Sequence, residues 1–132
     1  MAHGDFVWCD LSTFDVAGTR DFYGRLFGWS YDRIPQPDGS PYDVASINDV
    51  PQAGVFEMPE KFQKIGLPSF WMSYIQVDDA AAIVDLARQL GGKVEVGPIP
   101  YGEGALVALI RDPLGAGFTV YQGSDLSVRA QD

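Results

Sequence analysis

The alternation of hydrophobic and polar positions changes twice within the first half of the chain. Residues 6–13 alternate between apolar and polar side chains, which predicts a strand with one solvated face. Residues 16–27 then place aromatic and aliphatic side chains along one helical stripe, between Asp15 as a cap and Gly28 as a stop. Prolines and glycines separate three further predicted strands, which cover residues 29–34, 42–48 and 52–58. The first half therefore predicts the element order βαβββ.

The second half repeats this order. A predicted strand over residues 70–77 precedes a predicted helix over residues 79–90, with Asp78 as its cap and Gly91 as its stop. Three further strands are predicted near residues 93–96, 105–111 and 117–122. The chain therefore consists of two copies of one small module.

An internal repeat in the residues themselves supports this interpretation. Shifting the chain by 63 positions aligns residues 6–60 with residues 69–123 without a gap and gives 14 identities. Unrelated segments of this composition would give about three or four identities. Because each half would be marginal alone, we predict one domain over residues 1–132. Its predicted modules cover residues 6–58 and 70–123, with a linker at 59–69 and a polar tail at 124–132.

Charge and cysteine content narrow the classes of partner. Nine basic and 18 acidic residues give a net charge of −9, and the basic residues do not cluster, so we expect no nucleic-acid partner. The acidity serves solubility or attracts a cationic ligand. The single cysteine excludes an intrachain disulfide, and no spacing of Cys and His suits zinc. The sequence shows neither a signal peptide nor a long apolar run, so we predict a cytoplasmic protein that does not enter membranes.

Three segments carry a resemblance to a known family. FYGRLFGW, VDDAAAIVDLARQLGGKV and RDPLGAGFTVY, together with the duplicated module, resemble the vicinal oxygen chelate superfamily. This superfamily includes glyoxalase I, extradiol dioxygenases, fosfomycin-resistance enzymes and bleomycin-resistance proteins. The resemblance implies an α+β fold in which two tandem βαβββ modules form a curved mixed-sheet half-barrel cleft with helices outside. It also implies a homodimer.

The metal positions that the resemblance implies lack metal ligands here. They fall on Trp8, Met72, Thr119 and Phe56, whereas divalent metals in such sites need imidazole and carboxylate donors. The only histidine, His3, precedes the first strand, and we expect it to be solvated or disordered. We therefore predict no metal and no other cofactor.

Strand alternation predicts which side chains line the cleft, because successive residues point to opposite faces. With the implied metal positions facing inward, the predicted ligand-binding residues are Trp8, Asp10, Phe56, Met58, Met72, Tyr74, Thr119 and Tyr121. Ser12 and Gln76 share these faces, whereas Cys9, Leu11, Ile75, Val77, Phe118 and Val120 point toward the helices. The lining favours a flat or apolar molecule held by stacking and a few hydrogen bonds, unless these side chains fill a closed core.

Two residues and one loop have mainly structural interpretations. Asp112 is expected to accept hydrogen bonds from backbone amides of its turn. The loop over residues 101–104 is a surface turn or covers the cleft mouth. Cys9 is expected to be a buried small hydrophobe, because no histidine is available to activate it.

The sequence leaves three classes of function open. The first is a metal-independent binding protein of the glyoxalase and bleomycin-resistance type, which holds a small aromatic or cationic molecule. The second is a lyase, isomerase or dioxygenase with an atypical site, in which Asp10 is the base and Tyr74 or Tyr121 the acid. The third is an interaction module that pairs through its sheet edges.

Overall fold

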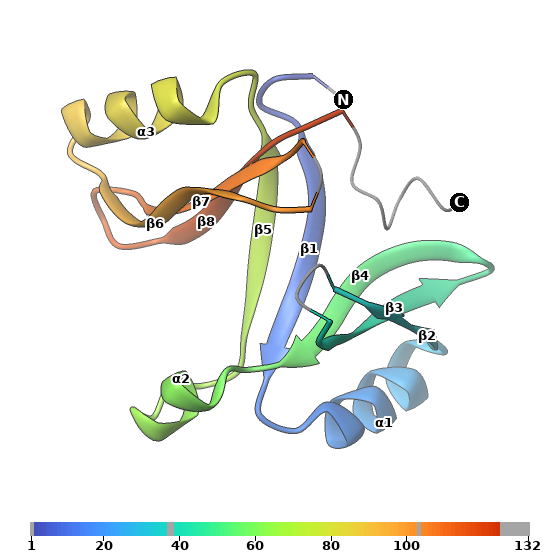
Figure 1. Cartoon of the computed structure of the whole chain (residues 1–132). Coiled ribbons are helices and arrows are strands. Elements are labelled where there is room, and N and C mark those ends of the chain that lie inside the picture. Colours follow the sequence, from blue (N-terminus) through green and yellow to red (C-terminus); the bar gives the residue numbers. More distant parts are fainter. Residues whose placement is uncertain (1, 37–38, 103, 125–132) are drawn as a thin grey trace. The chain divides into compact units, whose positions relative to one another are not determined.

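The computed structural model describes residues 2–36, 39–102 and 104–124, which contain eight strands and three helices (Figure 1). In chain order these are β1 (Phe6–Thr13), α1 (Val16–Phe27), β2 (Ser30–Pro35), β3 (Pro41–Ile47), β4 (Val50–Glu57), α2 (Glu60–Lys64), β5 (Phe70–Gln76), α3 (Ala80–Gln89), β6 (Lys93–Pro100), β7 (Leu106–Arg111) and β8 (Gly117–Gln122). The predicted α+β class and the βαβββ order of each half are confirmed. Residues 125–132 of the predicted tail lie outside the described residues, and so does Glu103 of the predicted cleft loop.

The chain divides into two compact units, and each is described by itself. Among the described residues, the α3 unit consists of residues 2–8 and 72–124, and the α1 unit consists of Cys9–Trp71. β1 and β5 contribute residues to both units. None of the helices in the described part of the chain is long and apolar enough to cross a membrane.

The α1 unit is built on strands in the order β2-β3-β4-β1. β3 runs antiparallel to both β2 and β4, and β1 runs parallel to β4 with Asp10 opposite Gly54. Asn48 and Asp49 connect β3 to β4, and both have positive φ, as the tightest hairpin turns require. β4 therefore begins at Val50, two residues earlier than the sequence pattern predicts.

Helix α1 begins and ends at the predicted residues. The Asp15 carboxylate accepts a hydrogen bond from the Gly18 amide at 2.9 Å, and Gly28 adopts a left-handed conformation with φ of 78°. The predicted linker contains the short helix α2, formed by Glu60–Lys64. Its five residues are too few to show a helical period, which is why the sequence pattern missed it.

The α3 unit has the strand order β5-β8-β7-β6, and α3 packs on one face of these strands. Its core consists of Val77, Ala80, Val84, Ala108, Ile110 and Val120, with Phe118 packed against them. The prediction that Val77, Phe118 and Val120 face the helix is therefore confirmed. Fully burying one such valine or isoleucine contributes about 1.5–3 kcal/mol.

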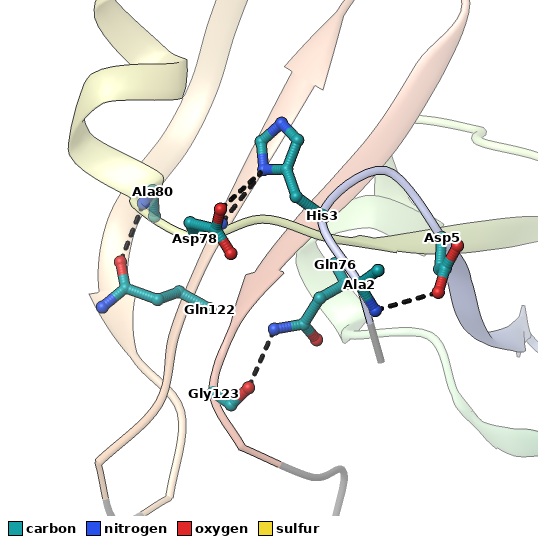
Figure 2. Close-up of polar contacts among 8 residues, drawn as sticks. All are labelled: Ala2, His3, Asp5, Gln76, Asp78, Ala80, Gln122 and Gly123. Carbon is teal, nitrogen blue, oxygen red and sulfur yellow. Dashed lines mark hydrogen bonds and ion pairs between the residues drawn. The ribbon is translucent and has the colours of Figure 1, made fainter.

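The cap of α3 differs from the prediction by one residue. Asp79, and not Asp78, accepts the hydrogen bond from the Ala82 amide, at 3.1 Å. The Asp78 amide instead donates to Nδ1 of His3 at 3.1 Å, so the half-exposed His3 helps to hold the start of the chain (Figure 2). His3 is exposed, as expected of a solvated side chain, and the residues before β1 also pair with Gln76 of β5.

The other predicted boundaries in the α3 unit hold with one extension. Gly91 has a left-handed φ of 91° and follows the end of α3, as predicted. β6 extends to Pro100, beyond the predicted end at residue 96. The Asp112 carboxylate accepts hydrogen bonds from the amides of Leu114 at 2.9 Å and Ala116 at 3.0 Å, which confirms its role in the turn.

Candidate functional site

In the α1 unit, the sheet face opposite α1 presents a carboxylate and a phenol in contact. The Tyr42 hydroxyl donates a hydrogen bond to the Asp10 carboxylate at 3.1 Å, and both residues are buried. The Phe56 ring stacks on the Tyr42 ring, with the ring centres 6.0 Å apart and the planes 18° apart. Gly54 makes this arrangement possible, because a Cβ atom there would overlap the Tyr42 hydroxyl. The sequence analysis named Asp10 and Phe56 as site residues but not Tyr42. Tyr42 lies in the predicted strand over residues 42–48, and nothing in the local pattern marked it as a partner of Asp10.

In the α3 unit, the sheet face opposite α3 presents a row of polar and aromatic side chains. Tyr74 of β5 lies beside Thr119 of β8, and Gln76 lies beside Tyr121. Thr119 and Tyr121 are buried, whereas Tyr74 is partly exposed. The Tyr101 ring meets the Tyr121 ring edge-on at 6.4 Å. At least the first residue of the predicted cleft loop therefore packs against a predicted site residue.

Gln76 carries an unsatisfied acceptor on this face. It is 6% exposed, and its Nε2 donates to the Gly123 carbonyl at 2.8 Å (Figure 2). Its Oε1 is buried and has no hydrogen-bond partner among the described residues. Nearly all buried polar atoms in folded proteins are hydrogen-bonded. We therefore expect Gln76 Oε1 to accept a hydrogen bond from a group outside the described residues.

The structure divides the predicted ligand-binding residues into two sets. The α3 unit holds Trp8, Met72, Tyr74, Thr119 and Tyr121, and the α1 unit holds Asp10, Phe56 and Met58. Within the α1 unit Asp10 is paired with Tyr42, which the prediction did not include. Met58 is only 1% exposed, so its side chain belongs to the packed interior.

The residues present do not fit a divalent metal at the positions that the resemblance implies. At the four implied positions, the thioether of Met72 and the hydroxyl of Thr119 are weak ligands, and the other two side chains are aromatic. Nowhere in the described ranges do three or more His, Cys, Asp or Glu side chains gather as a metal site would require. We therefore derive no chemistry through a metal at this site.

A second polar cluster lies on the α1 side of the α1 unit. Asp43 is 1% exposed and accepts two hydrogen bonds from the Arg33 guanidinium, at 2.8 and 3.1 Å. Arg20 of α1 lies 3.6 Å from the same carboxylate and stacks over the Tyr31 ring. Burial raises the pKa of the Tyr31 phenol, and the hydrogen bond to Asp43 raises the pKa of Arg33. This cluster ties α1 to β2 and β3, and sequence reasoning did not find it.

Cys9 is half-buried, and its thiol points toward the Gln52 carbonyl at 3.9 Å. Burial raises the pKa of the Cys9 thiol, and the negative charge of Asp10 raises it further. A raised pKa keeps the unreactive thiol form up to higher pH. The structure therefore supports a structural and not a nucleophilic role for Cys9.

We expect iodoacetamide to alkylate Cys9 in the folded protein more slowly than it alkylates free cysteine at pH 8. The pH at which the rate is half-maximal should exceed that of free cysteine, because the thiolate is disfavoured. Mass spectrometry at a series of pH values measures the rate, and the same protein in urea is the control. A midpoint at or below that of free cysteine would contradict the expected shift.

Comparison with known proteins places the chain among sequences of one superfamily. The sequence model of the Glyoxalase/Bleomycin resistance protein/Dioxygenase superfamily matches residues 5–120. A putative glyoxylase, CFP32, of Mycobacterium bovis is 36% identical over 118 residues, which cover 89% of this chain and 45% of that protein. The anthracycline biosynthesis protein DnrV of Streptomyces peucetius is 30% identical over 132 residues, 92% of this chain and 48% of DnrV. The chain thus spans about half the length of these relatives.

Solved structures share the fold at low sequence identity. A hypothetical protein, BH1468, from Bacillus halodurans superposes with a TM-score of 0.68 at 16% identity, covering 96% of this chain and 99% of that one. The methylmalonyl-CoA epimerase of Streptomyces coelicolor superposes with a TM-score of 0.63 at 15% identity, covering 93% of this chain and 96% of the epimerase. At such identities the likeness concerns the fold alone.

Proposed function

Because the chain belongs to the Glyoxalase/Bleomycin resistance protein/Dioxygenase superfamily, we propose that it binds a small, flat molecule without a metal ion, on the β5 and β8 face of the α3 unit. The observation that carries the proposal is the buried, unsatisfied Oε1 of Gln76. A ligand with an N–H or O–H group would supply the missing donor. The absence of metal ligands at the implied positions supports binding by stacking and hydrogen bonds.

The side chains around Gln76 favour an aromatic ligand. Tyr74 and Met72 are partly exposed on the same face, and rings stack well on both aromatic and thioether groups. Tyr121 and Thr119 form a buried floor beside them. A ligand placed there would meet one hydrogen-bond acceptor and several apolar surfaces, as is typical of small-molecule sites.

The net charge of the chain and the names of two relatives indicate which kind of ligand to test first. The net charge of −9 favours a neutral or cationic molecule over an anion. Two relatives are named for anthracycline biosynthesis, and anthracyclines are flat polycyclic aromatic molecules that carry hydroxyl groups. We therefore choose a hydroxylated anthraquinone as the first probe.

We expect a dihydroxyanthraquinone to bind in calorimetric titrations, and the unsubstituted anthraquinone to bind about 10-fold more weakly. The difference is the value of one hydrogen bond to a buried acceptor. Gln76→Met keeps the side-chain volume but removes the acceptor, and should reduce affinity for the dihydroxy probe about 10-fold. Gln52→Met, the same change at an exposed position, is the control and should leave affinity unchanged.

Three results would contradict the proposal. The first is that neither probe binds, and the second is that Gln76→Met binds the dihydroxy probe as well as the wild-type protein does. The third is a loss of affinity when a chelator is added, because it would show that a metal takes part in binding. Thermal unfolding of each variant verifies that the protein tested is folded.

A further inference from the structure

Helix α1 and the end of β1 border a groove with aromatic walls. The groove has a volume of about 380 Å³, which lies within the size range of small-molecule sites. Its lining includes Phe14, Phe22, Tyr23 and Trp71, with Asp15 among them. Phe14, Phe22 and Trp71 are 60%, 59% and 42% exposed, so their rings are open to a ligand. We call this hollow the aromatic groove, and these five residues all belong to the α1 unit.

The rings of the aromatic groove are ordered against one another. Tyr23 meets Trp71 edge-on, with the ring centres 5.7 Å apart and the planes 84° apart, and Phe22 meets Tyr23 edge-on at 5.1 Å. The Trp71 indole N–H donates to the Tyr23 hydroxyl at 3.3 Å. Side chains held in this way lose little conformational freedom when a ligand binds. Clustered rings are typical of sites that bind quaternary ammonium groups.

Asp15 supplies a negative charge beside the rings. Of the described residues that line the groove, Asp15 alone carries a charge. Its backbone amide donates to Thr13 Oγ1 at 3.2 Å, and its Oδ1 accepts from the Gly18 amide at 2.9 Å, so the carboxylate is held in place. Because the Gly18 amide is already paired with this carboxylate, the start of α1 does not offer that donor to an anion. A fixed carboxylate among ring faces favours a cation.

The arginines of α1 do not offset this charge. Arg25 lies 3.0 Å from Asp21, and Arg20 lies 3.6 Å from Asp43, so both are paired with other carboxylates. Neither arginine lines the groove. The net charge of −9 adds a general attraction for cations. The electrostatics of the groove therefore favour a positively charged ligand.

The second module lacks the rings of the aromatic groove. The shift of 63 positions aligns Phe14, Phe22 and Tyr23 with Val77, Asp85 and Leu86. The cap is common to both modules, because Asp79 caps α3 as Asp15 caps α1. The aromatic groove is thus a property of the α1 unit and not of the repeated module.

We propose that the aromatic groove binds the alkylammonium group of a small, freely dissolved organic cation. Alkyl substituents on the nitrogen suit apolar ring faces, whereas a metal ion needs several oxygen or nitrogen ligands at short distances. The Asp15 carboxylate lies beside these rings and balances the positive charge. The site differs in place and in chemistry from the face of the α3 unit, where Gln76 Oε1 requires a hydrogen-bond donor.

Choline and its neutral isostere test the proposal. In the isostere a carbon atom replaces the nitrogen, so the two molecules share their shape and differ in charge. We expect choline to bind saturably, and the isostere to bind about 10-fold more weakly, because only choline gains the attraction of the ring faces and of Asp15. NMR titration of the tryptophan indole N–H signals measures both affinities. The signal that is missing in Trp71→Phe identifies Trp71, and this signal should shift with choline.

Two pairs of variants locate the site. Asp15→Asn removes the charge but keeps a capping side chain, and should weaken choline binding about 3-fold without affecting the isostere. Asp79→Asn makes the same change at the cap of α3 and should leave the choline affinity unchanged. Phe14→Leu should weaken choline binding about 3-fold. Phe6→Leu, at a ring that is 71% exposed and outside the groove, should not.

Three outcomes would overturn the proposal. Equal affinities for choline and the isostere would show that the groove takes up apolar groups without regard to charge. Equal weakening by Asp15→Asn and Asp79→Asn would show a general effect of net charge. No saturable shift with choline would leave no site for a dissolved cation, and sedimentation of the protein with phosphatidylcholine vesicles in that case would assign the head group to a lipid surface. The titration contains no anthraquinone, so its result is independent of the site proposed in the α3 unit, and circular dichroism verifies that each variant is folded.

Discussion

Gly54→Ala is expected to lower the free energy of unfolding by about 3 kcal/mol. A Cβ atom at this position would overlap the hydroxyl and ring of Tyr42, which is only 3% exposed. The clash would separate Tyr42 from the Asp10 carboxylate and leave two buried polar groups without their hydrogen bond. Urea unfolding followed by circular dichroism measures the loss.

The internal repeat provides a matched control for this substitution. Gly54 aligns with Gly117, where a Cβ atom would meet its nearest neighbours only at 3.8 Å and 4.0 Å. Gly117→Ala should therefore change the stability by less than about 1 kcal/mol, and in the stabilising direction if chain entropy dominates. Equal losses at the two positions would show that the Tyr42 contact is not the cause.

Arg33→Ala is expected to lower the free energy of unfolding by clearly more than the loss of an exposed ion pair does, the second large effect. The Asp43 carboxylate is buried and would lose both hydrogen bonds from Arg33, while Arg20 remains 3.6 Å away. A buried carboxylate that loses its hydrogen bonds is costly, even though the Arg33 side chain itself is 57% exposed. The free energy of unfolding in urea again provides the measurement.

Two comparisons isolate the buried charge as the cause. Arg25→Ala removes an ion pair of similar length, 3.0 Å to Asp21, but both partners are exposed, so we expect a loss of less than about 1 kcal/mol. Adding Asp43→Asn to Arg33→Ala should recover part of the loss, because it removes the buried charge that has lost its hydrogen bonds to Arg33. A double variant that is less stable than Arg33→Ala alone would contradict this explanation.

The polar pairs of the site show why sequence reasoning found some residues and not their partners. Alternation along β1 predicted that Asp10 and Leu11 point to opposite faces of the sheet. The structure agrees, because side-chain direction along a strand is a local property. The pairing of Asp10 with Tyr42 depends on the register of three strands, β1, β4 and β3. Register is decided by contacts between segments distant in sequence, so no local pattern contains it.

Two details at the end of β5 differ from, or go beyond, the sequence pattern. The repeat aligned Asp15 with Asp78 and thereby predicted the wrong cap for α3, because one residue of difference at the end of β5 places Asp79 before the helix. His3 is exposed as expected, but its imidazole also accepts a hydrogen bond from the Asp78 amide, 75 residues away, and no local pattern contains that contact.

The sequence by itself determined the element order, the caps of α1 and the faces of the strands, because each depends on neighbouring residues and on backbone geometry. It also determined that the implied metal positions lack ligands, since that follows from residue identity alone. Tertiary structure alone decided that Asp43 is buried with Arg33, that Gln76 keeps an unsatisfied oxygen and that α1 exposes its aromatic side chains. Burial and hydrogen bonding depend on contacts between residues that are distant in the sequence, so the local pattern of hydrophobic and polar residues does not predict them.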